Sequence, residues 1–195
     1  ISQRLREPII IGDTEWLPGA SSGVALGMKD DDGAALLRNA DLAMYEAKAQ
    51  GKGQYTFYHC GLSRDAQRRS SLQTRLENAL EANEIVAYFQ PIVDLETQAP
   101  GRLEALARWL PQSGDPVPPA EFIPLAENSD LILDIEETII DQALATVKRI
   151  RRQHREHHDI TVSANVSARH FGHPKLIPTL ERLLDHHQLP PSALI

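Results

Sequence analysis

The sequence predicts an α/β protein, because short apolar strands alternate with amphipathic helices along most of the chain. From residue 85 onward, apolar strand patterns are separated by segments whose apolar residues recur at helical spacing. This order is typical of a parallel sheet covered by helices. Before residue 85, two short strand patterns flank a helix, and a long polar helix follows. The length of 195 residues suffices for one or two domains with buried cores.

The first part of the chain contains a strand, a helix and a second strand. A strand is expected over 21–27 and another over 54–58. Between them, residues 34–50 carry apolar residues at helical spacing, with Asp32 available to cap the helix and Gly51 placed to end it. A second helix is expected over 63–83, with Leu72, Leu76, Ala79 and Leu80 on one stripe. Its arginines, Arg64, Arg68 and Arg69, favour a solvated face, and we interpret this helix as a linker between domains.

The second part of the chain repeats the strand and helix pattern on a larger scale. Predicted domain boundaries are 1–60 for the first domain, 61–84 for the helical linker and 85–195 for the second domain. Within the second domain the predicted elements follow in order: strands over 85–95 and 103–110, a proline-rich loop at 116–119, helices over 120–128 and 130–153, a strand over 160–167 and a helix over 174–188. A further strand is expected to start at Leu194 and Ile195.

Composition and charge exclude several classes of protein. Hydrophobic residues make up 42% and charged residues 24% of the chain, as in an ordinary globular protein. The net charge of −7 opposes binding to a nucleic acid polymer by bulk electrostatics. Cys60 is the single cysteine, which fits a reducing compartment, and no apolar run reaches the roughly 20 residues of a membrane helix. We expect a cytoplasmic fragment of a longer parent, whose membrane anchor, if it has one, lies elsewhere.

Polar residues on the predicted strands suggest a site. Two-residue alternation places Glu104, Leu106 and Arg108 on one face of their strand. Asn165 lies near the end of the next strand, and Gln90 occupies a comparable place on the first, so that these groups converge if parallel strands form a barrel. Glutamate and asparagine oxygens suit Mg²⁺ or Mn²⁺, and an arginine can hold a phosphate. Spacing alone favours a plain structural ion pair over metal-assisted phosphodiester chemistry.

Several ordered motifs change that balance, because they resemble the EAL domain family over 85–195. The matching segments are YFQPIVD at 88–94, LEALARW at 103–109, FIPLAE at 122–127 and NVSAR at 165–169. The resemblance implies part of a modified TIM-type (β/α) barrel that hydrolyses cyclic di-GMP to linear pGpG, with metal ions activating a water. It further implies that Glu104 and Asn165 bind Mg²⁺ or Mn²⁺, that Arg108 holds a phosphate, that Leu106 supports the dinucleotide and that Gln90 lines the same pocket. The resemblance also marks Pro124 and Glu127 as family landmarks, more structural than catalytic.

The chain departs from the family pattern at Asn128, where a second glutamate is common, and at Asp130, where glycine is common. The resemblance also places the paired aspartates, the remaining metal carboxylates and the catalytic lysine beyond Ile195. We therefore expect the chain alone to be inactive, since half a barrel leaves an open edge. A catalytically silent EAL domain, acting as a cyclic di-GMP receptor or an interaction module, is the alternative. Retention of Glu104 and Asn165 favours the enzyme.

The first part of the chain resembles the end of a GGDEF domain, which has a nucleotidyl-cyclase-like α+β fold. The matching segments are SGVALG at 22–27, LLRNADLAMYEAK at 36–48 and GK at 51–52. The resemblance implies that Lys48 and Lys52 lie near nucleotide phosphates. Stabilisation of the helix end by these lysines is an equal alternative. The GGDEF signature would precede Ile1, so no cyclase activity is expected in this chain. In the parent, the GGDEF half is expected to make cyclic di-GMP, to bind GTP only in order to regulate its neighbour, or to be degenerate, and a parent that acts mainly as a cyclase is a further alternative. EAL domains commonly pair, so a homodimeric parent is compatible with the resemblance.

The histidines form short clusters near predicted helix ends. These are His154, His157 and His158, then His170 with His173, and then His186 with His187. A zinc face is one interpretation, but structural zinc sites usually recruit cysteine as well. Polar helix ends are therefore favoured.

Overall fold

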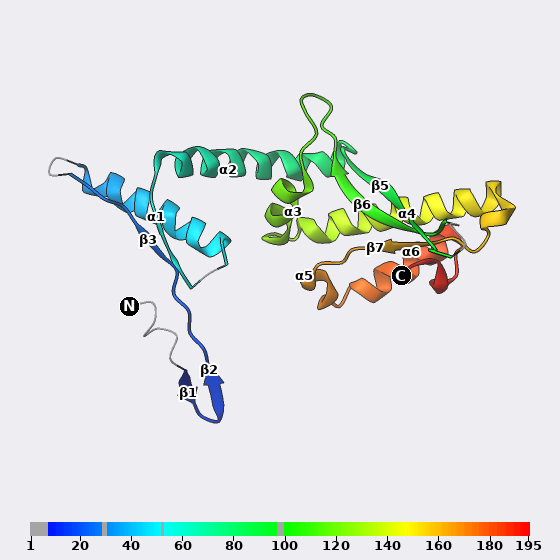
Figure 1. The fold of residues 1–195 in the computed structure, drawn as a ribbon, viewed down its shortest axis with the longest axis horizontal. Coiled ribbons are helices and arrows are strands. Elements are labelled where there is room, and N and C mark those ends of the chain that lie inside the picture. Colours follow the sequence, from blue (N-terminus) through cyan, green and yellow to red (C-terminus); the bar gives the residue numbers. More distant parts are fainter. Residues whose placement is uncertain (1–7, 29–30, 52, 97–99) are drawn as a thin grey trace. The chain divides into compact units, whose positions relative to one another are not determined.

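The computed structural model describes residues 8–28, 31–51, 53–96 and 100–195 (Figure 1). The chain divides into two compact units between Ser71 and Leu72. This division falls inside helix α2 (Cys60–Glu81), within the segment expected to link two domains. Among the described residues, no helix combines the length and apolar character that crossing a membrane requires.

The first unit contains a hairpin and a strand–helix–strand unit. Strands β1 (Ile9–Ile11) and β2 (Thr14–Trp16) pair in antiparallel fashion. Strands β3 (Ser22–Val24) and β4 (Tyr55–Phe57) are parallel, and helix α1 (Gly33–Ala49) connects them. Both predicted strands and the predicted helix are confirmed, although the strands are shorter than expected. Asp32 caps the helix as predicted, since its side chain accepts a hydrogen bond from the Ala34 N–H at 3.1 Å.

Small residues allow α1 and β3 to approach closely. Ala43 and Ala47 are fully buried on the helix. A Cβ atom at Gly23 would overlap the carbonyl oxygen of Ala40 and the backbone nitrogen of Met44. The absence of a side chain at Gly23 is therefore what permits this contact between strand and helix.

The second unit is built on the sheet β5-β6-β7. Its strands are β5 (Ile85–Val93), β6 (Pro100–Trp109) and β7 (Thr161–Ala164). Strands β6 and β7 are parallel, but β5 and β6 are antiparallel, so the prediction of a parallel sheet was wrong for the first strand. The connection at 94–99 is too short for a parallel crossover, which needs a dozen or more residues. Leu194 forms a parallel bridge to Val162 of β7, where a further strand was expected.

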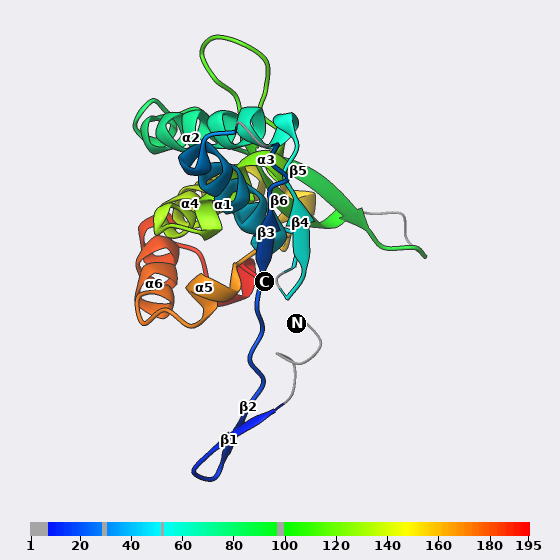
Figure 2. The ribbon, with the colours of Figure 1, turned by 90° about the vertical axis from the view of Figure 1, so that its left-hand side faces the viewer.

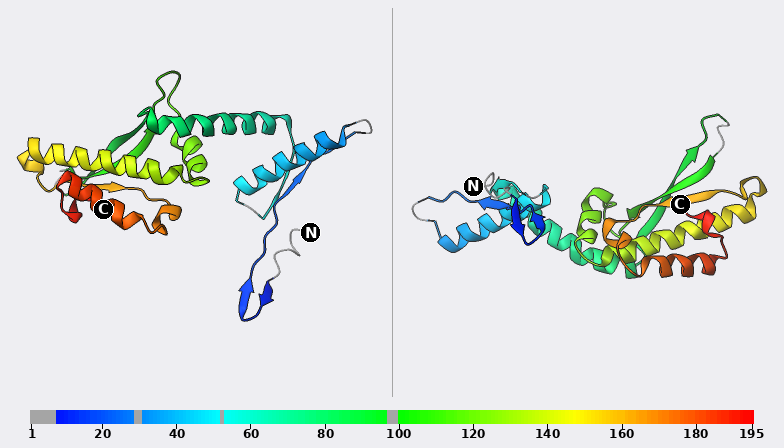
Figure 3. Two further views of the ribbon diagram at one scale, coloured as in Figure 1. Left: turned by 180° about the vertical axis from the view of Figure 1, so that it is seen from behind. Right: turned by 90° about the horizontal axis from the view of Figure 1, so that it is seen from below.

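Helices cover one face of this sheet. Helix α4 (Leu131–Gln153) packs against all of its strands, α3 (Pro119–Glu127) packs against α4 and β6, and α6 (Leu176–His187) packs against α4. Figure 3 shows α4 running along the sheet, and in Figure 2 the ends of β5 and β6 extend beyond the helices. A short helix, α5 (Ala168–Phe171), follows β7 and was not predicted. Two 3₁₀ turns, η2 (Arg155–His157) and η3 (Pro191–Ala193), follow α4 and α6.

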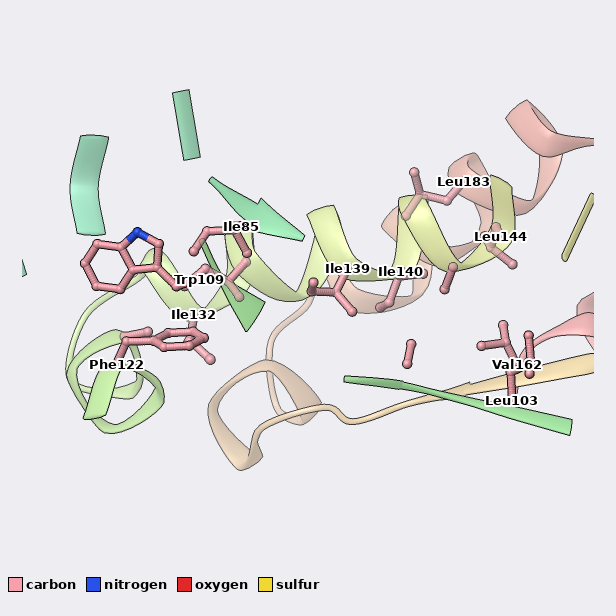
Figure 4. Close-up of a cluster of buried hydrophobic side chains, with 14 of the residues drawn as sticks. Ile85, Leu103, Trp109, Phe122, Ile132, Ile139, Ile140, Leu144, Val162 and Leu183 are labelled. Carbon is pink, nitrogen blue, oxygen red and sulfur yellow. The ribbon is translucent and has the colours of Figure 1, made fainter. Parts of the chain in front are cut away.

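A single apolar cluster joins the sheet to its helices. Trp109 and Phe122 are fully buried and pack edge to face, with ring centroids 5.9 Å apart. Figure 4 shows Ile85 and Ile132 beside this aromatic pair, and Leu144, Val162 and Leu183 at the other end of the cluster. The core therefore fixes β6 and β7 against α4.

Candidate functional site

Strand β6 separates core side chains from candidate site residues by simple alternation. Ala105 and Trp109 point into the core and are 2% and 0% exposed. Glu104, Leu106 and Arg108 are partly exposed on the other face. The predicted alternation of β6 is thus confirmed.

The parallel register of β6 and β7 brings Glu104 and Asn165 together. Glu104 lies opposite Ser163, and Ala105 lies opposite Ala164, which is the last residue of β7. Asn165 follows directly, and its Nδ2 donates a hydrogen bond to Oε1 of Glu104 at 3.1 Å. Two residues that are 61 positions apart in the sequence therefore meet at one edge of the sheet.

Gln90 also lies beside Glu104, because the two residues are partners in the antiparallel register of β5 and β6. We expected Gln90 near Glu104 because the ends of parallel strands converge. That reason was wrong, since β5 and β6 are antiparallel. The register alone therefore places Gln90 next to Glu104.

Arg108 is held in place by contacts on its own strand and on β5. One guanidinium nitrogen donates to the carbonyl oxygen of Ala107 at 2.8 Å. The guanidinium carbon lies 5.7 Å from the centre of the Tyr88 ring, in a cation–π arrangement. These contacts hold a permanent positive charge near the end of β6.

A pocket opens beside these residues, between the ends of β6 and β7 and helices α3 and α4. Its polar lining includes Arg108, Glu127, Glu136, Asn165 and Ser167, and its apolar lining includes Leu106 and Ile135. Glu104 lies next to this lining through its hydrogen bond to Asn165. The pocket therefore combines the Arg108 guanidinium and the Glu127 carboxylate with an apolar floor.

Sequence reasoning missed a buried polar pair at this pocket. Glu136 is 6% exposed and His170 is 3% exposed, and Oε2 of Glu136 lies 2.6 Å from Nδ1 of His170. The signal was present in the sequence, because Glu136 stands four residues from both Ile132 and Ile140 on the apolar stripe of α4. A carboxylate in such a stripe needs a buried partner.

The two departures from the family pattern have local roles. Asn128 donates from Nδ2 to the carbonyl oxygen of Pro124 at 2.7 Å, near the end of α3. Asp130 accepts from Arg169 at 2.5 Å, which links the start of α4 to α5. The Arg169 guanidinium lowers the pKa of the Asp130 carboxyl below its ordinary value, first through this hydrogen bond and then through its charge.

The donor chemistry of Glu104 and Asn165 fits a hard divalent cation. A carboxylate and an amide carbonyl are oxygen donors of the kind that Mg²⁺ and Mn²⁺ bind. The described residues contain no cluster of three or more His, Cys, Asp or Glu side chains with metal-binding geometry. Several histidines have carboxylate partners instead: His154 with Glu156, His170 with Glu136, and His187 with Asp141.

The candidate phosphate contacts of the first unit are less defined. Lys48 is exposed in the last turn of α1, and its Nζ lies 5.5 Å from the centre of the Tyr45 ring. Lys52 lies outside the described residues.

Comparison with known proteins gives consistent matches. Residues 73–195 match the EAL domain family. The chain is 35% identical, over 99% of its length, to MucR of Pseudomonas aeruginosa, a bifunctional diguanylate cyclase/cyclic di-GMP phosphodiesterase, and 32% identical over 94% of its length to the cyclic di-GMP phosphodiesterase PdeR of Escherichia coli. It spans about a quarter of the length of these relatives, namely 28% and 27%.

Solved structures agree with these matches. The MucR phosphodiesterase in complex with c-di-GMP superposes with a TM-score of 0.57 at 33% identity, over 64% of this chain and 49% of that chain. The FimX EAL domain from Pseudomonas aeruginosa bound to c-di-GMP superposes with a TM-score of 0.53 at 28% identity, over 63% of this chain and 48% of that chain.

Proposed function

The chain belongs to the EAL domain family, and we propose from this premise that the face carrying Glu104 forms part of a site that hydrolyses cyclic di-GMP to linear pGpG. The observation that supports the proposal most strongly is the hydrogen bond between Glu104 and Asn165, because Asn165 also lines the pocket that Arg108 lines. The phosphodiesterases MucR and PdeR among its relatives support the same reaction.

Glu104 and Asn165 would hold Mg²⁺ or Mn²⁺ through side-chain oxygens. EAL domains generally depend on divalent metal ions, and the ion supplies an activated water for attack on phosphorus. The hydrogen bond from Asn165 to Glu104 places these two side chains next to each other at the edge of the sheet.

Arg108, Leu106 and Gln90 would bind the dinucleotide. The Arg108 guanidinium is directed along the site by Tyr88 and offers several N–H donors to a phosphate. Leu106 lies on the same face and supplies apolar surface for a base or a ribose. Gln90, across from Glu104, supplies an amide that can both donate and accept hydrogen bonds.

The assay uses the complete product of the gene that encodes this chain, because the chain covers 49% of the MucR phosphodiesterase structure. With Mg²⁺ or Mn²⁺ and cyclic di-GMP, chromatography should show pGpG. The variant Glu104→Gln should lose on the order of 100-fold or more in turnover, since a ligand matters at least as much as its supporting groups. Glu181→Gln, at an exposed position on α6, is the charge-matched control.

Cyclic di-GMP binding without turnover by the complete gene product would contradict the enzyme and support a receptor. Equal turnover by the Glu104→Gln and Glu181→Gln variants would show that the reaction occurs elsewhere.

For the first unit we propose the end of a GGDEF domain, with Lys48 and Lys52 near the phosphates of GTP. The parallel strands β3 and β4 joined by α1 support this assignment, and so does the match to the bifunctional MucR, which extends over 99% of the chain. In the complete gene product, Lys48→Ala should weaken GTP binding measured by calorimetry. Unchanged affinity would leave Lys48 as a helix-end residue.

A homodimer is expected, and sedimentation of the complete product tests it.

A further inference from the structure

We propose that the buried Glu136–His170 pair is a positioning device, which holds the turn after β7 so that Asn165 reaches Glu104. This inference rests on the proposed function of the face that carries Glu104. It assigns a role to two residues that do not belong to the predicted site, and that role is geometric rather than chemical.

Both oxygens of the Glu136 carboxylate are used. Oε1 accepts the backbone N–H of Ser167 at 2.7 Å, and Oε2 lies 2.6 Å from Nδ1 of His170. Because a carboxylate can only accept, Nδ1 of His170 carries the hydrogen of this second bond. The Glu136 side chain of α4 is thus hydrogen-bonded both to the Ser167 backbone at the end of the turn and to the His170 ring of α5.

These two contacts hold the connection from β7 to α5. At its start, Ala164 lies in register with Ala105 of β6. At its end, Ser167 is the N-cap of α5, and its Oγ accepts the His170 N–H at 3.2 Å. Asn165 lies between these two fixed points, one residue after β7 and two residues before Ser167. With both ends fixed, the exposed Asn165 side chain is kept against Glu104.

A buried polar pair is weak evidence for a gain in stability. Removing two polar groups from water is costly, and apolar replacements of similar volume are often neutral or stabilising. A buried pair that offers little net stability is better explained by the geometry that it imposes on the turn. The hydrogen bond to Ser167 shows which backbone it fixes.

The same unit contains a second His–carboxylate pair that serves as a control, with a carboxylate that is more exposed than Glu136. His187 of α6 lies with Nε2 2.8 Å from Oδ1 of Asp141 on α4, and His187 is 8% exposed. This pair also joins a histidine to a carboxylate of α4, but it ties α6 to α4 rather than the β7–α5 turn. Substitutions there test the loss of a His–carboxylate pair as such.

The test compares the double variants Glu136→Leu/His170→Leu and Asp141→Leu/His187→Leu. In the 195-residue chain, the NMR signal of the Asn165 side-chain amide should move toward that of a solvent-exposed asparagine in the first variant and stay unchanged in the second. The melting temperature of the first variant should fall only slightly, because two apolar side chains replace the buried polar pair while the Ser167 N–H loses its acceptor. The single variant His170→Gln keeps Glu136 and supplies an amide that can donate to it, so it should keep the wild-type Asn165 signal.

In the complete gene product, the first double variant should need about ten to one hundred times more Mn²⁺ for half-maximal hydrolysis of cyclic di-GMP. A wild-type Asn165 signal and an unchanged Mn²⁺ requirement in that variant would overturn the inference while the proposed function stands. If the wild-type product does not hydrolyse cyclic di-GMP, the proposed function fails, and the amide signal alone then decides whether the pair positions Asn165.

Discussion

Glu84 lies between α2 and β5, and both of its carboxylate oxygens accept hydrogen bonds from residues at or just after the end of β6. Oε2 accepts the indole N–H of Trp109 at 3.0 Å, and Oε1 accepts the backbone N–H of Gln112 at 2.9 Å. The hydrogen bond from Gln112 and then that from Trp109 lower the pKa of Glu84 below its ordinary value. The fully buried Trp109 thereby has a partner for its only polar group.

We expect this carboxylate to make stability depend on pH. Its pKa is lower in the folded state than in the unfolded state, so its contribution is complete above the unfolded value of about 4.3 and is lost as the pH falls through the lower folded pKa. Glu84→Gln should therefore lower the free energy of unfolding at pH 7 by about 1 kcal/mol. Urea titrations at pH 7 and at successively lower pH measure the difference from the wild type.

That difference should shrink as the pH drops below about 4. Glu81→Gln, at an exposed position of α2, is the control and should change stability little at either pH. A difference between wild type and Glu84→Gln that stays constant with pH would show that the carboxylate charge is not what stabilises the contact.

Single residues also show how far the sequence could be used to predict the site. Alternation along β6 placed Glu104 and Arg108 on one face, and this required only the two-residue period of a strand. The contact from Asn165 to Glu104 depends on the register of β6 and β7, which no local pattern contains. Glu136 was overlooked because its apolar neighbours on α4 dominated the helical pattern, and only its burial gives it meaning.

At the scale of elements, helices were easier to predict than strand pairing. The expected helices over 34–50 and 130–153 correspond closely to α1 and α4, since their apolar stripes are long and periodic. The orientation of β5 was wrong, because it is decided by the length of a connection rather than by the strand itself. The hairpin of β1 and β2 was missed, although Gly12, with φ of 63°, marks a two-residue turn.

The close contact of β3 with α1 predicts a large effect of one methyl group. Gly23→Ala should destabilise the first unit by about 1–3 kcal/mol, because the new Cβ would overlap backbone atoms of Ala40 and Met44 that cannot move independently. Hydrogen exchange of the α1 amides measures the loss. Gly19→Ala, with no heavy atom within 4 Å of its added Cβ, is the control, and equal exchange in the two variants would contradict the packing described for Gly23.

The contact between α3 and β6 predicts a comparable effect in the second unit. Phe122→Ala should lower the free energy of unfolding by about 3–5 kcal/mol, because it empties space beside the fully buried Trp109. Phe171→Ala removes the same ring from α5, where it is 80% exposed, and should cost less than about 0.5 kcal/mol. Denaturant unfolding compares the two variants, and similar losses would show that Phe122 is not part of the core.

At the scale of the whole molecule, the two units and the family match have nearly the same boundary. The units divide between Ser71 and Leu72, and the EAL match begins at residue 73. The linker expected over 61–84 contains both points, because α2 combines a polar first half with the buried Leu72 and Leu76. The order of the motifs indicated the family from the sequence alone. The boundary between the units was harder to place, because it falls inside α2 and each unit contains part of that helix.

Anomalous diffraction from crystals of the complete gene product grown with Mn²⁺ tests the proposed site most directly. The site predicts an anomalous peak within about 2.0–2.6 Å of a Glu104 carboxylate oxygen and of the Asn165 side-chain oxygen, distances that are ordinary for oxygen ligands of hard cations. A Mn²⁺ peak bound elsewhere, with Glu104 and Asn165 still joined only to each other, would contradict the assignment of this face as the metal centre of a cyclic di-GMP phosphodiesterase.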